Sequence, residues 1–330
     1  MTCLDIIARL RGRMRRLAAF GRADCEATRE PFRLGAVFAL VYFATAMYEL
    51  PTQTLTVVLK ERLGLSASRA ATFFFLVSIP WFAKPLYGLL SDFVPIFHRR
   101  RKSYLIITMI LATSAGFMLS FRKGMEYWSI TPLYMTMALG IAFSDVMVNA
   151  IMVEVGRPRG LTGLFQWGAA YAGIIVVGAI GGYFAESRNL RGAFALTAWS
   201  TLLSCVIATF FIHEPASFLD THLRDNWLWL RKAFSTRSSW IVFAFILFWT
   251  FSPSFGPAFL YYQTDVLKFR QQFIGWLSSL SSAAAVVGAV LYAALSRRLP
   301  LTTLVIIAIG LGCLSTLAYL LYRDIPAQLL

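Results

Sequence analysis

Charged side chains are scarce in this sequence. They make up 14% of its 330 residues, with 16 Asp and Glu against 31 Lys and Arg. A soluble domain carries about a quarter charged residues, so a chain this poor in charge is not expected to be soluble. The net charge of +15 would suggest nucleic acid in a soluble protein. Aromatic residues do not interleave with the basic runs, however, and we expect no nucleic-acid partner.

Residues that carry common catalytic or metal chemistry are also few. The three histidines show no metal-ligand spacing, and the four cysteines show no paired spacing. The sequence holds no Gly-rich phosphate loop, no GxSxG elbow and no HExxH motif. We therefore predict no catalytic residue, no metal site and no cofactor, and a membrane-embedded enzyme is disfavoured.

Apolar residues are abundant instead. Hydrophobic residues make up 58% of the chain, and the mean hydropathy is +0.64. Stretches of about 20 apolar residues recur along its length, each long enough to cross a bilayer as a helix. The sequence thus predicts an all-α polytopic membrane protein with nine spans, at 34–58, 69–91, 103–121, 129–153, 160–184, 192–213, 238–262, 271–295 and 301–322.

Polar composition separates these spans into two groups. The segment 214–237 contains Pro215, three acids and four basic residues, and is predicted to be a linker between two halves. Six spans precede it and three follow. The expected organisation is an N-terminal arm (1–33), a six-helix bundle (34–213), the linker (214–237) and an incomplete second bundle (238–330).

The distribution of basic residues predicts the orientation in the membrane. With the N-terminus inside, cytoplasmic segments hold 20 Lys and Arg and outer segments ten, which is the positive-inside pattern. The basic charge then serves topology and contact with anionic membrane lipids. The Arg-rich arm (1–33) lacks a signal-peptide core and is predicted to stay cytoplasmic, with an organellar transit peptide as the alternative. We expect a bacterial inner membrane, or else a plastid or eukaryotic plasma membrane.

Two segments recur at almost one spacing. LYGLLSDFVP (86–95) returns 205 residues later as LYAALSRRLP (291–300), with five of ten positions identical. VVLKERLGLS from Val57 is echoed 204 residues later by YYQTDVLKFR from Tyr261. Two such echoes indicate a duplicated bundle with a unit of about 205 residues. A complete second copy would extend beyond Leu330, so helices 10–12 of a twelve-helix carrier are expected to be missing from this sequence.

Ionisable residues inside the spans are the first candidates for function, because charges at membrane depth are expensive. Glu49 falls in the outer half of the first span. Lys84 and Asp145 fall toward the inner half at similar depth, so an ion pair between them would ease both desolvation penalties. Asn149 lies one turn beyond Asp145 on the same helix face. A buried pair that only orders the bundle, or a Lys84 that snorkels to the inner surface, is the structural alternative.

Glycine and proline mark positions of unusual packing. Gly178 and Gly182 form a GxxxG spacing, which favours close helix contact in lipid. Prolines fall inside several spans, and the pair Pro253 and Pro257 with Gly256 predicts a bent or interrupted seventh helix.

The loop after the second span carries GLLSD (88–92) and then RRRK (99–102). This glycine, aspartate and basic cluster resemble the cytoplasmic gate motif of the major facilitator superfamily. The longer string LVSIPWFAKPLYGLLSDFVPIFHRRRKSYL (76–105) is similar to the folate–biopterin transporter family in particular. SDVMVNAIMVE (144–154), LTGLFQWGAAYAG (161–173) and FSPSFGPAFLYYQTDVLKF (251–269) are similar to its helix-4, helix-5 and helix-7 segments. The family pattern has a second acid where Asn149 stands, so proton coupling by two carboxylates would be altered here.

The resemblance implies a major facilitator fold and secondary active transport of folate or pterin-like organic anions by alternating access, with proton symport as one mode of coupling. Lys84 would lie nearest an anionic substrate or pair with Asp145, and Glu49 or Asp145 would couple protons. A cytoplasmic gate is implied at Gly88, Asp92, Arg100 and Arg101. Aromatic residues would stack on a flat heterocycle, the candidates being Tyr42, Tyr48, Trp81, Trp167, Tyr261 and Tyr262.

Alternatives remain open at this point. Fold does not determine cargo, so a facilitator for a sugar, a drug or a peptidoglycan fragment is the second hypothesis. A truncated, non-transporting remnant is the third. Substrate identity, the coupling ion and its direction, oligomeric state and source organism do not follow from the residues.

Overall fold

A computed structural model describes residues 35–97, 99–124, 126–156, 163–212, 214, 235–250, 256–296 and 298–318. These residues form helices joined by short turns, with one isolated β-bridge between Ile96 and Arg99. The prediction of an all-α chain is confirmed. The predicted N-terminal arm (1–33) and most of the predicted linker (214–237) lie outside the described residues.

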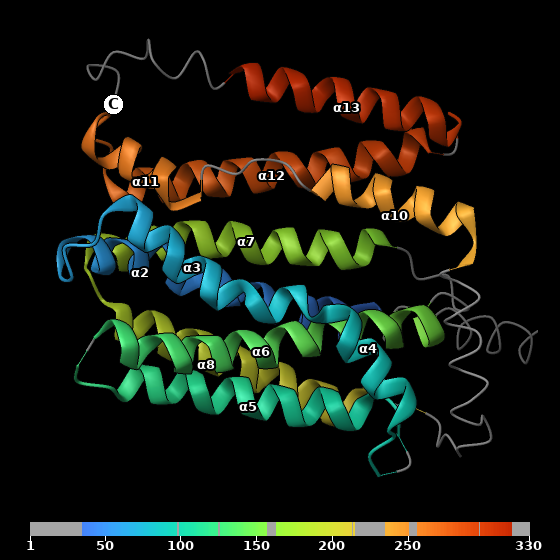
Figure 1. Ribbon diagram of the computed structural model, residues 1–330, viewed down its shortest axis with the longest axis horizontal. Coiled ribbons are helices and arrows are strands. Elements are labelled where there is room, and N and C mark those ends of the chain that lie inside the picture. Colours follow the sequence, from blue (N-terminus) through green and yellow to red (C-terminus); the bar gives the residue numbers. More distant parts are fainter. Residues whose placement is uncertain are drawn as a thin grey trace, which may run out of the picture.

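Figure 1 shows the helices side by side with their long axes roughly aligned. Residues 35–46 are helical and lead into a short 3₁₀ turn. The elements, in chain order after residue 46, are η1 (Met47–Glu49), α2 (Leu50–Glu61), α3 (Ala67–Phe82), α4 (Lys84–Phe93), α5 (Lys102–Phe121), α6 (Tyr127–Ile151), the π-turn η2 (Met152–Gly156), α7 (Gly163–Glu186), α8 (Leu190–Phe211), α10 (Arg237–Thr250), α11 (Gly256–Asp265), α12 (Gln271–Leu295) and α13 (Leu301–Ala318).

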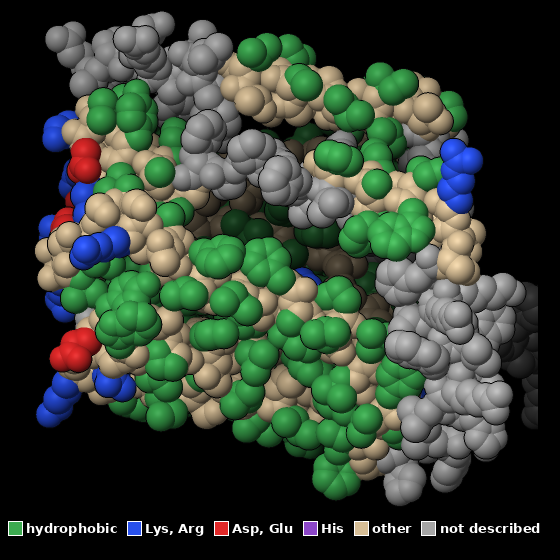
Figure 2. All heavy atoms as spheres, in the orientation of Figure 1, with side chains coloured by type: hydrophobic (Ala, Val, Ile, Leu, Met, Phe, Trp, Pro, Cys, Tyr) green, Lys and Arg blue, Asp and Glu red, His purple; other side chains and the backbone are tan. Residues whose placement is uncertain are grey.

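Six helices in the described part of the chain are long and apolar enough to cross a membrane. They cover Ala67–Phe93, Lys102–Phe121, Tyr127–Glu154, Gln166–Glu186, Leu190–Phe211 and Gln271–Leu295. Figure 2 shows hydrophobic side chains across the middle of the molecule and charged side chains gathered at its ends. The chain is therefore a multi-pass membrane protein, as predicted.

The predicted count of nine spans is not confirmed. The first predicted span is divided by η1 into residues 35–46 and α2. The seventh corresponds to α10 and α11, which flank residues 251–255, and Pro253 lies outside the described residues. The ninth corresponds to α13, whose apolar stretch Thr302–Leu317 is shorter than the six above.

Two helix breaks place the residues of interest. Pro51 occupies the first turn of α2, directly after the 3₁₀ turn that ends at Glu49. Pro85 occupies the first turn of α4, directly after the break at Ala83. Proline fits a first helical turn because it has no N–H to donate. Pro51 thus lies at the start of a helix segment that directly follows Glu49. Pro85 lies at the start of a helix segment whose first residue is Lys84.

Within the first half of the chain, α5, α6 and α8 form a closely packed group. The α5 helix lies against both α6 and α8. A Cβ at Gly140 would lie 2.5 Å from the backbone oxygen of Thr108, so only glycine permits this approach of α5 and α6. The hydroxyls of Thr108 and Ser144 are hydrogen bonded at 2.9 Å across the same interface.

The two halves of the chain meet chiefly through α7 and α12, which pack along each other. A Cβ at Gly178 would lie 2.6 Å from the backbone oxygen of Gly275. The Ser279 hydroxyl donates a 2.7 Å hydrogen bond to the carbonyl of Ile175 in the same interface. The close packing predicted from the glycine spacing of Gly178 and Gly182 is thus present, with α12 as the partner.

Candidate functional site

The predicted pair of intramembrane charges is in contact. Lys84 begins α4 and Asp145 lies near the end of α6, with Nζ and Oδ2 2.7 Å apart. An ammonium at a helix N-terminus is opposed by the helix dipole. The Asp145 carboxylate offsets both that repulsion and part of the desolvation penalty of the lysine. The side chains remain 33% and 21% exposed, so neither charge is sealed away from a ligand.

An aromatic row begins at this ion pair. The Lys84 ammonium lies 4.3 Å from the ring centroid of Trp81, a cation–π contact. Trp81 packs on Tyr48 at 5.9 Å, and Tyr48 stacks on Tyr134 at 5.7 Å. Tyr48 and Tyr134 are buried, whereas Trp81 is half-buried. The row therefore connects Lys84 on α4 through α3 and η1 to α6.

A cavity of about 440 Å³ opens between the two halves of the chain. Its walls come from η1 and α2, α3, α7, α11 and α12. Glu49, the last residue of η1, lines it with an exposed side chain. The Glu49 Oε2 accepts one long hydrogen bond, 3.3 Å, from the Thr52 hydroxyl. Among the described residues, no ion pair involves Glu49.

Thr52 joins this cavity to the aromatic row. Its hydroxyl lies 3.2 Å from the hydroxyl of Tyr134 as well as 3.3 Å from Glu49. A continuous series of contacts thus runs from the carboxylate to the ammonium, and we call it the polar–aromatic row: Glu49, Thr52, Tyr134, Tyr48, Trp81 and Lys84. Sequence reasoning named Glu49 and Lys84 as charged candidates and Tyr48 and Trp81 as aromatic ones. It missed Thr52 and Tyr134, whose only signal is a hydroxyl within an apolar helix.

Asn149 belongs to a separate neutral cluster one turn beyond Asp145. Its Oδ1 accepts hydrogen bonds from the Tyr42 hydroxyl at 2.8 Å and from Gln166 Nε2 at 2.5 Å. The Tyr42 hydroxyl also lies 3.6 Å from the sulfur of Met152. The cluster ties α6 to α7 and to the helical residues before η1. Because both donors point at the amide oxygen, Asn149 acts here as an acceptor.

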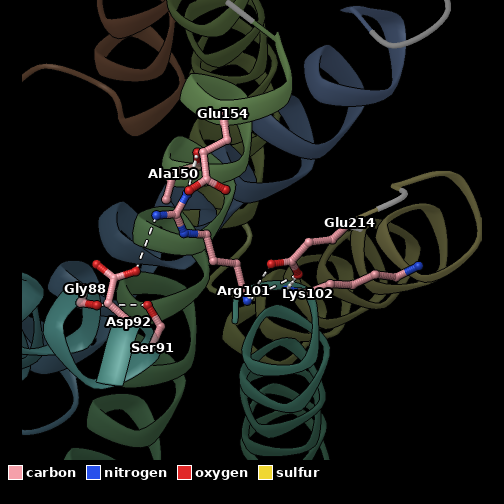
Figure 3. A network of polar contacts seen from close by, with 8 residues as sticks. All are labelled: Gly88, Ser91, Asp92, Arg101, Lys102, Ala150, Glu154 and Glu214. Atoms are coloured by element: carbon pink, nitrogen blue, oxygen red, sulfur yellow. Dashed lines mark hydrogen bonds and ion pairs between the residues drawn. The ribbon is translucent and has the colours of Figure 1, made fainter. Parts of the chain in front are cut away.

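The predicted cytoplasmic gate centres on one arginine (Figure 3). Arg101 Nη2 lies 3.4 Å from Asp92 Oδ1, and Nη1 lies 2.5 Å from Glu154 Oε1. The same Nη1 donates to the carbonyl of Ala150 at 3.0 Å. The Arg101 side chain is only 14% exposed. It therefore links the end of α4 to the end of α6 in a largely dehydrated position.

Glu214 holds this arginine in place from the far side (Figure 3). Its carboxylate accepts hydrogen bonds from the backbone N–H of Arg101 at 3.2 Å and of Lys102 at 2.7 Å. These are unpaired donors at the start of α5, where a carboxylate is favoured by the helix dipole. Lys102 also donates to the carbonyl of Thr209 on α8 at 2.7 Å. Sequence reasoning counted Glu214 only as the first residue of a linker.

The other two predicted gate residues have lesser contacts. In the described part of the chain no ion pair involves Arg100, and its buried Nε has no hydrogen-bond partner. At Gly88 an added Cβ would meet only Val146, at an ordinary 3.9 Å. The carbonyl of Gly88 accepts a 2.9 Å hydrogen bond from the hydroxyl of Ser91. The functional roles of both residues therefore stay predictions.

The chemistry available at the row is ligand and proton binding. The row offers the Glu49 carboxylate, which lines the cavity, and the Lys84 ammonium, which is paired with Asp145. Aromatic rings lie between the two charged groups. Among the described residues, no cluster of three or more His, Cys, Asp or Glu is arranged to hold a metal ion.

Comparison with known proteins identifies relatives over most of the chain. A family model described as the BT1 family matches residues 46–322. The "Folate-biopterin transporter" of Synechocystis sp. is 31% identical over 270 residues, covering 79% of this chain and 54% of the relative. "Folate transporter 2" of Plasmodium falciparum is 24% identical, covering 82% of this chain and 61% of the relative.

A plant relative is similar over a shorter region. "Probable folate-biopterin transporter 4" of Arabidopsis thaliana is 29% identical over 185 residues, covering 54% of this chain and 38% of the relative. The chain thus spans roughly 40 to 60% of the length of these relatives.

Proposed function

Because the chain belongs to the BT1 family, we propose that it transports folate or a related pterin-like organic anion across a membrane. Its relatives are named as transporters and not as enzymes. Secondary active transport by alternating access, in a major facilitator arrangement, is the mechanism that we infer. The membrane is proposed to be a bacterial inner membrane, with its lipids around the apolar helix faces.

The observation that carries this proposal is the Lys84–Asp145 pair covered by Trp81. A partly exposed ammonium at membrane depth is suited to attract the carboxylate of an organic anion, because charge attraction is strong where water is scarce. An arriving anion competes with Asp145 for Lys84. We propose that a proton then takes the place of Lys84 beside Asp145, which couples anion uptake to proton uptake.

The cavity at Glu49 and the Arg101 network are suited to the opening and closing of a carrier on its two sides. The cavity beside Glu49 is formed by both halves of the chain, so relative rocking of the halves would open and close it. The Arg101 network bridges α4 and α6 within the first half. We propose that it keeps the cytoplasmic ends of these helices together and so sets the shape of the inner gate.

Equilibrium binding tests this function directly. The protein, expressed and purified in detergent, is expected to bind tritiated folate saturably, with displacement by pterins and little displacement by glucose or a muropeptide. Lys84→Met should weaken binding about tenfold or more. Lys123→Met, in an exposed outer loop, is the matched control and should bind like wild type. Saturable binding of the sugar or muropeptide, without folate binding, would replace this proposal by the second hypothesis.

A proton gradient tests the coupling. In proteoliposomes an inward-directed proton gradient should accelerate folate uptake, and Asp145→Asn should remove that acceleration. Uptake that is insensitive to the gradient would exclude proton coupling while leaving folate transport intact.

A further inference from the structure

Glu49 is an ionisable residue at membrane depth that has little charge compensation among the described residues. Its carboxylate faces the cavity between the halves and accepts one long hydrogen bond from Thr52, at 3.3 Å. A carboxylate at membrane depth normally pairs with a cation or with several donors. The described residues around it supply neither, so the Glu49 carboxylate can accept further hydrogen bonds from a ligand in the cavity.

The composition of the cavity narrows the chemistry of its occupant. The described residues that line it include Glu49 as their only charged side chain. An anionic group would be repelled there. Half-buried Phe74 supplies an aromatic wall, and most of the remaining lining is apolar. A flat, uncharged, donor-bearing heterocycle fits these walls, whereas the charged tail of an organic anion does not.

From this arrangement we propose that Glu49 binds the 2-amino-4-oxopyrimidine edge of a pterin ring, while Lys84 binds the anionic tail of the same substrate. The inference rests on the proposed function. That edge carries a ring N–H and an exocyclic NH₂ side by side, which donate two parallel hydrogen bonds to one carboxylate. The geometry is that of a bidentate guanidinium–carboxylate pair. Glu49 then determines which heterocycle is accepted.

The spacing of the two charges agrees with a substrate that has a head and a tail. Glu49 lies 12 residues before the outer end of α2 at Glu61, and Lys84 lies 17 residues after the outer end of α3 at Ala67. At 1.5 Å per residue, their depths differ by roughly 8 Å. The polar–aromatic row connects the two positions. We propose that a pterin ring beside Glu49 places its substituent at about the depth of Lys84.

The decisive measurement compares pterin with lumazine, in which an oxygen replaces the 2-amino group. Both compete against tritiated folate on the purified wild-type protein. A carboxylate that accepts a hydrogen bond from the amino group should favour pterin about 10- to 100-fold. This ratio corresponds to the free energy that one hydrogen bond to a charged group contributes. Equal affinity for the two heterocycles would overturn the assignment of Glu49, even if folate binding upholds the proposed function.

Glu49→Gln tests the residue itself. The change replaces one carboxylate oxygen by an NH₂ donor, which suits the oxygen of lumazine, so the preference for pterin should disappear or reverse. Glu126→Gln is the same change at an exposed outer position and should keep the wild-type preference. An unchanged preference in a folded Glu49→Gln protein would overturn the inference. If that variant does not fold, the wild-type comparison of pterin and lumazine still decides.

A tail fragment separates the two ends of the site. p-Aminobenzoylglutamate has the anionic tail of folate without the pterin ring. Its binding should be lost in Lys84→Met and retained in Glu49→Gln. Equal loss in both variants would contradict a divided site. If folate, pterin and the fragment all fail to bind the wild-type protein, the proposed function itself is wrong.

Discussion

The ammonium of Lys60 donates a 2.7 Å hydrogen bond to the hydroxyl of Thr264, a residue 204 positions later in the chain. This separation equals the spacing of the sequence echo that begins at Val57 and Tyr261. Two equivalent positions of the proposed repeat are therefore in direct contact. Such a contact arises where a pseudo-two-fold axis passes between two related halves. The same ammonium pairs with Asp265 and lies 4.9 Å from the ring centroid of Tyr261.

These contacts predict a closure at the end of the molecule that the charge distribution assigns to the outside. Lys60→Asp places two acids together, so the outer ends should separate more often. The reporter is Ser278→Cys in the cavity, in a protein without native cysteines, labelled from outside by an impermeant maleimide. The pair is partly exposed and worth about 1 kcal/mol or less. Labelling should therefore accelerate severalfold.

A charge swap supplies the control for this closure. Lys60→Asp combined with Asp265→Lys should return labelling toward the wild-type rate. Arg69→Asp makes the same change in net charge at an exposed outer position and should have little effect. Labelling at one rate in all four proteins would mean that this ion pair does not hold the outer end closed.

The glycine contact between α7 and α12 gives a second prediction. A Cβ at Gly275 would overlap the backbone oxygen of Gly178, so Gly275→Ala must push the two helices apart. Overpacking of this kind costs about 1–3 kcal/mol, and the midpoint of thermal unfolding should fall by several degrees. Gly288→Ala lies on the same helix where nothing is within 4 Å of the added Cβ. Its unfolding midpoint should match or exceed that of wild type.

Some of these features follow from sequence and others do not. Apolar helices that cross the membrane and the contact between Lys84 and Asp145 could be predicted, because hydropathy gives depth. The break at Ala83 that starts α4 at Lys84 was not predicted, since 69–91 was expected to be one continuous span. Depth does not give the rotation of each helix about its axis. The link from Glu49 through Thr52 to Tyr134 depends on that rotation, and it was missed.

The predicted cytoplasmic end shows the same limit. Sequence reasoning placed both Arg100 and Arg101 with Asp92 in the predicted gate. The structure supplies Arg101, because its backbone N–H is held by Glu214 at the first turn of α5. Glu214 lies more than 100 positions from Arg101 in the sequence, so no local sequence pattern predicts this contact.

The gate prediction concerns charge and geometry at Arg101. Arg101→Lys keeps the charge but cannot bridge Asp92 and Glu154 with two separate nitrogen arms. Asp92→Asn removes one ion pair. We expect folate uptake to fall severalfold in either variant at unchanged protein level, with the larger loss in Arg101→Lys.

Neighbouring residues test whether this loss is specific to Arg101. Arg99→Lys, at an exposed position, should transport like wild type. Arg100→Lys decides whether Arg100 belongs to the gate, because a loss comparable to that of Arg101→Lys would restore the role that its sequence position predicts. Wild-type uptake by both Arg101→Lys and Asp92→Asn would remove the gate assignment.

The last prediction concerns the ion pair between Lys84 and Asp145. Lys84→Met leaves Asp145 without its cation, and Asp145→Asn leaves Lys84 without its anion. Each change should destabilise the protein by about 1–3 kcal/mol, less than for a fully buried pair, since both side chains keep some exposure. The double variant has no unpaired charge and should recover stability relative to the sum of the single changes, by about 0.5–3 kcal/mol.

Thermal unfolding in detergent measures this coupling, and folate binding is followed in the same four proteins. Recovery of stability without recovery of binding would assign the pair a part in holding substrate as well as in folding. Strictly additive effects on stability would mean that the 2.7 Å contact contributes no coupling energy. Lys84 would then have to be regarded as a cation held by Trp81 alone, available to substrate at all times, and Asp145 would no longer be the group that an arriving anion displaces.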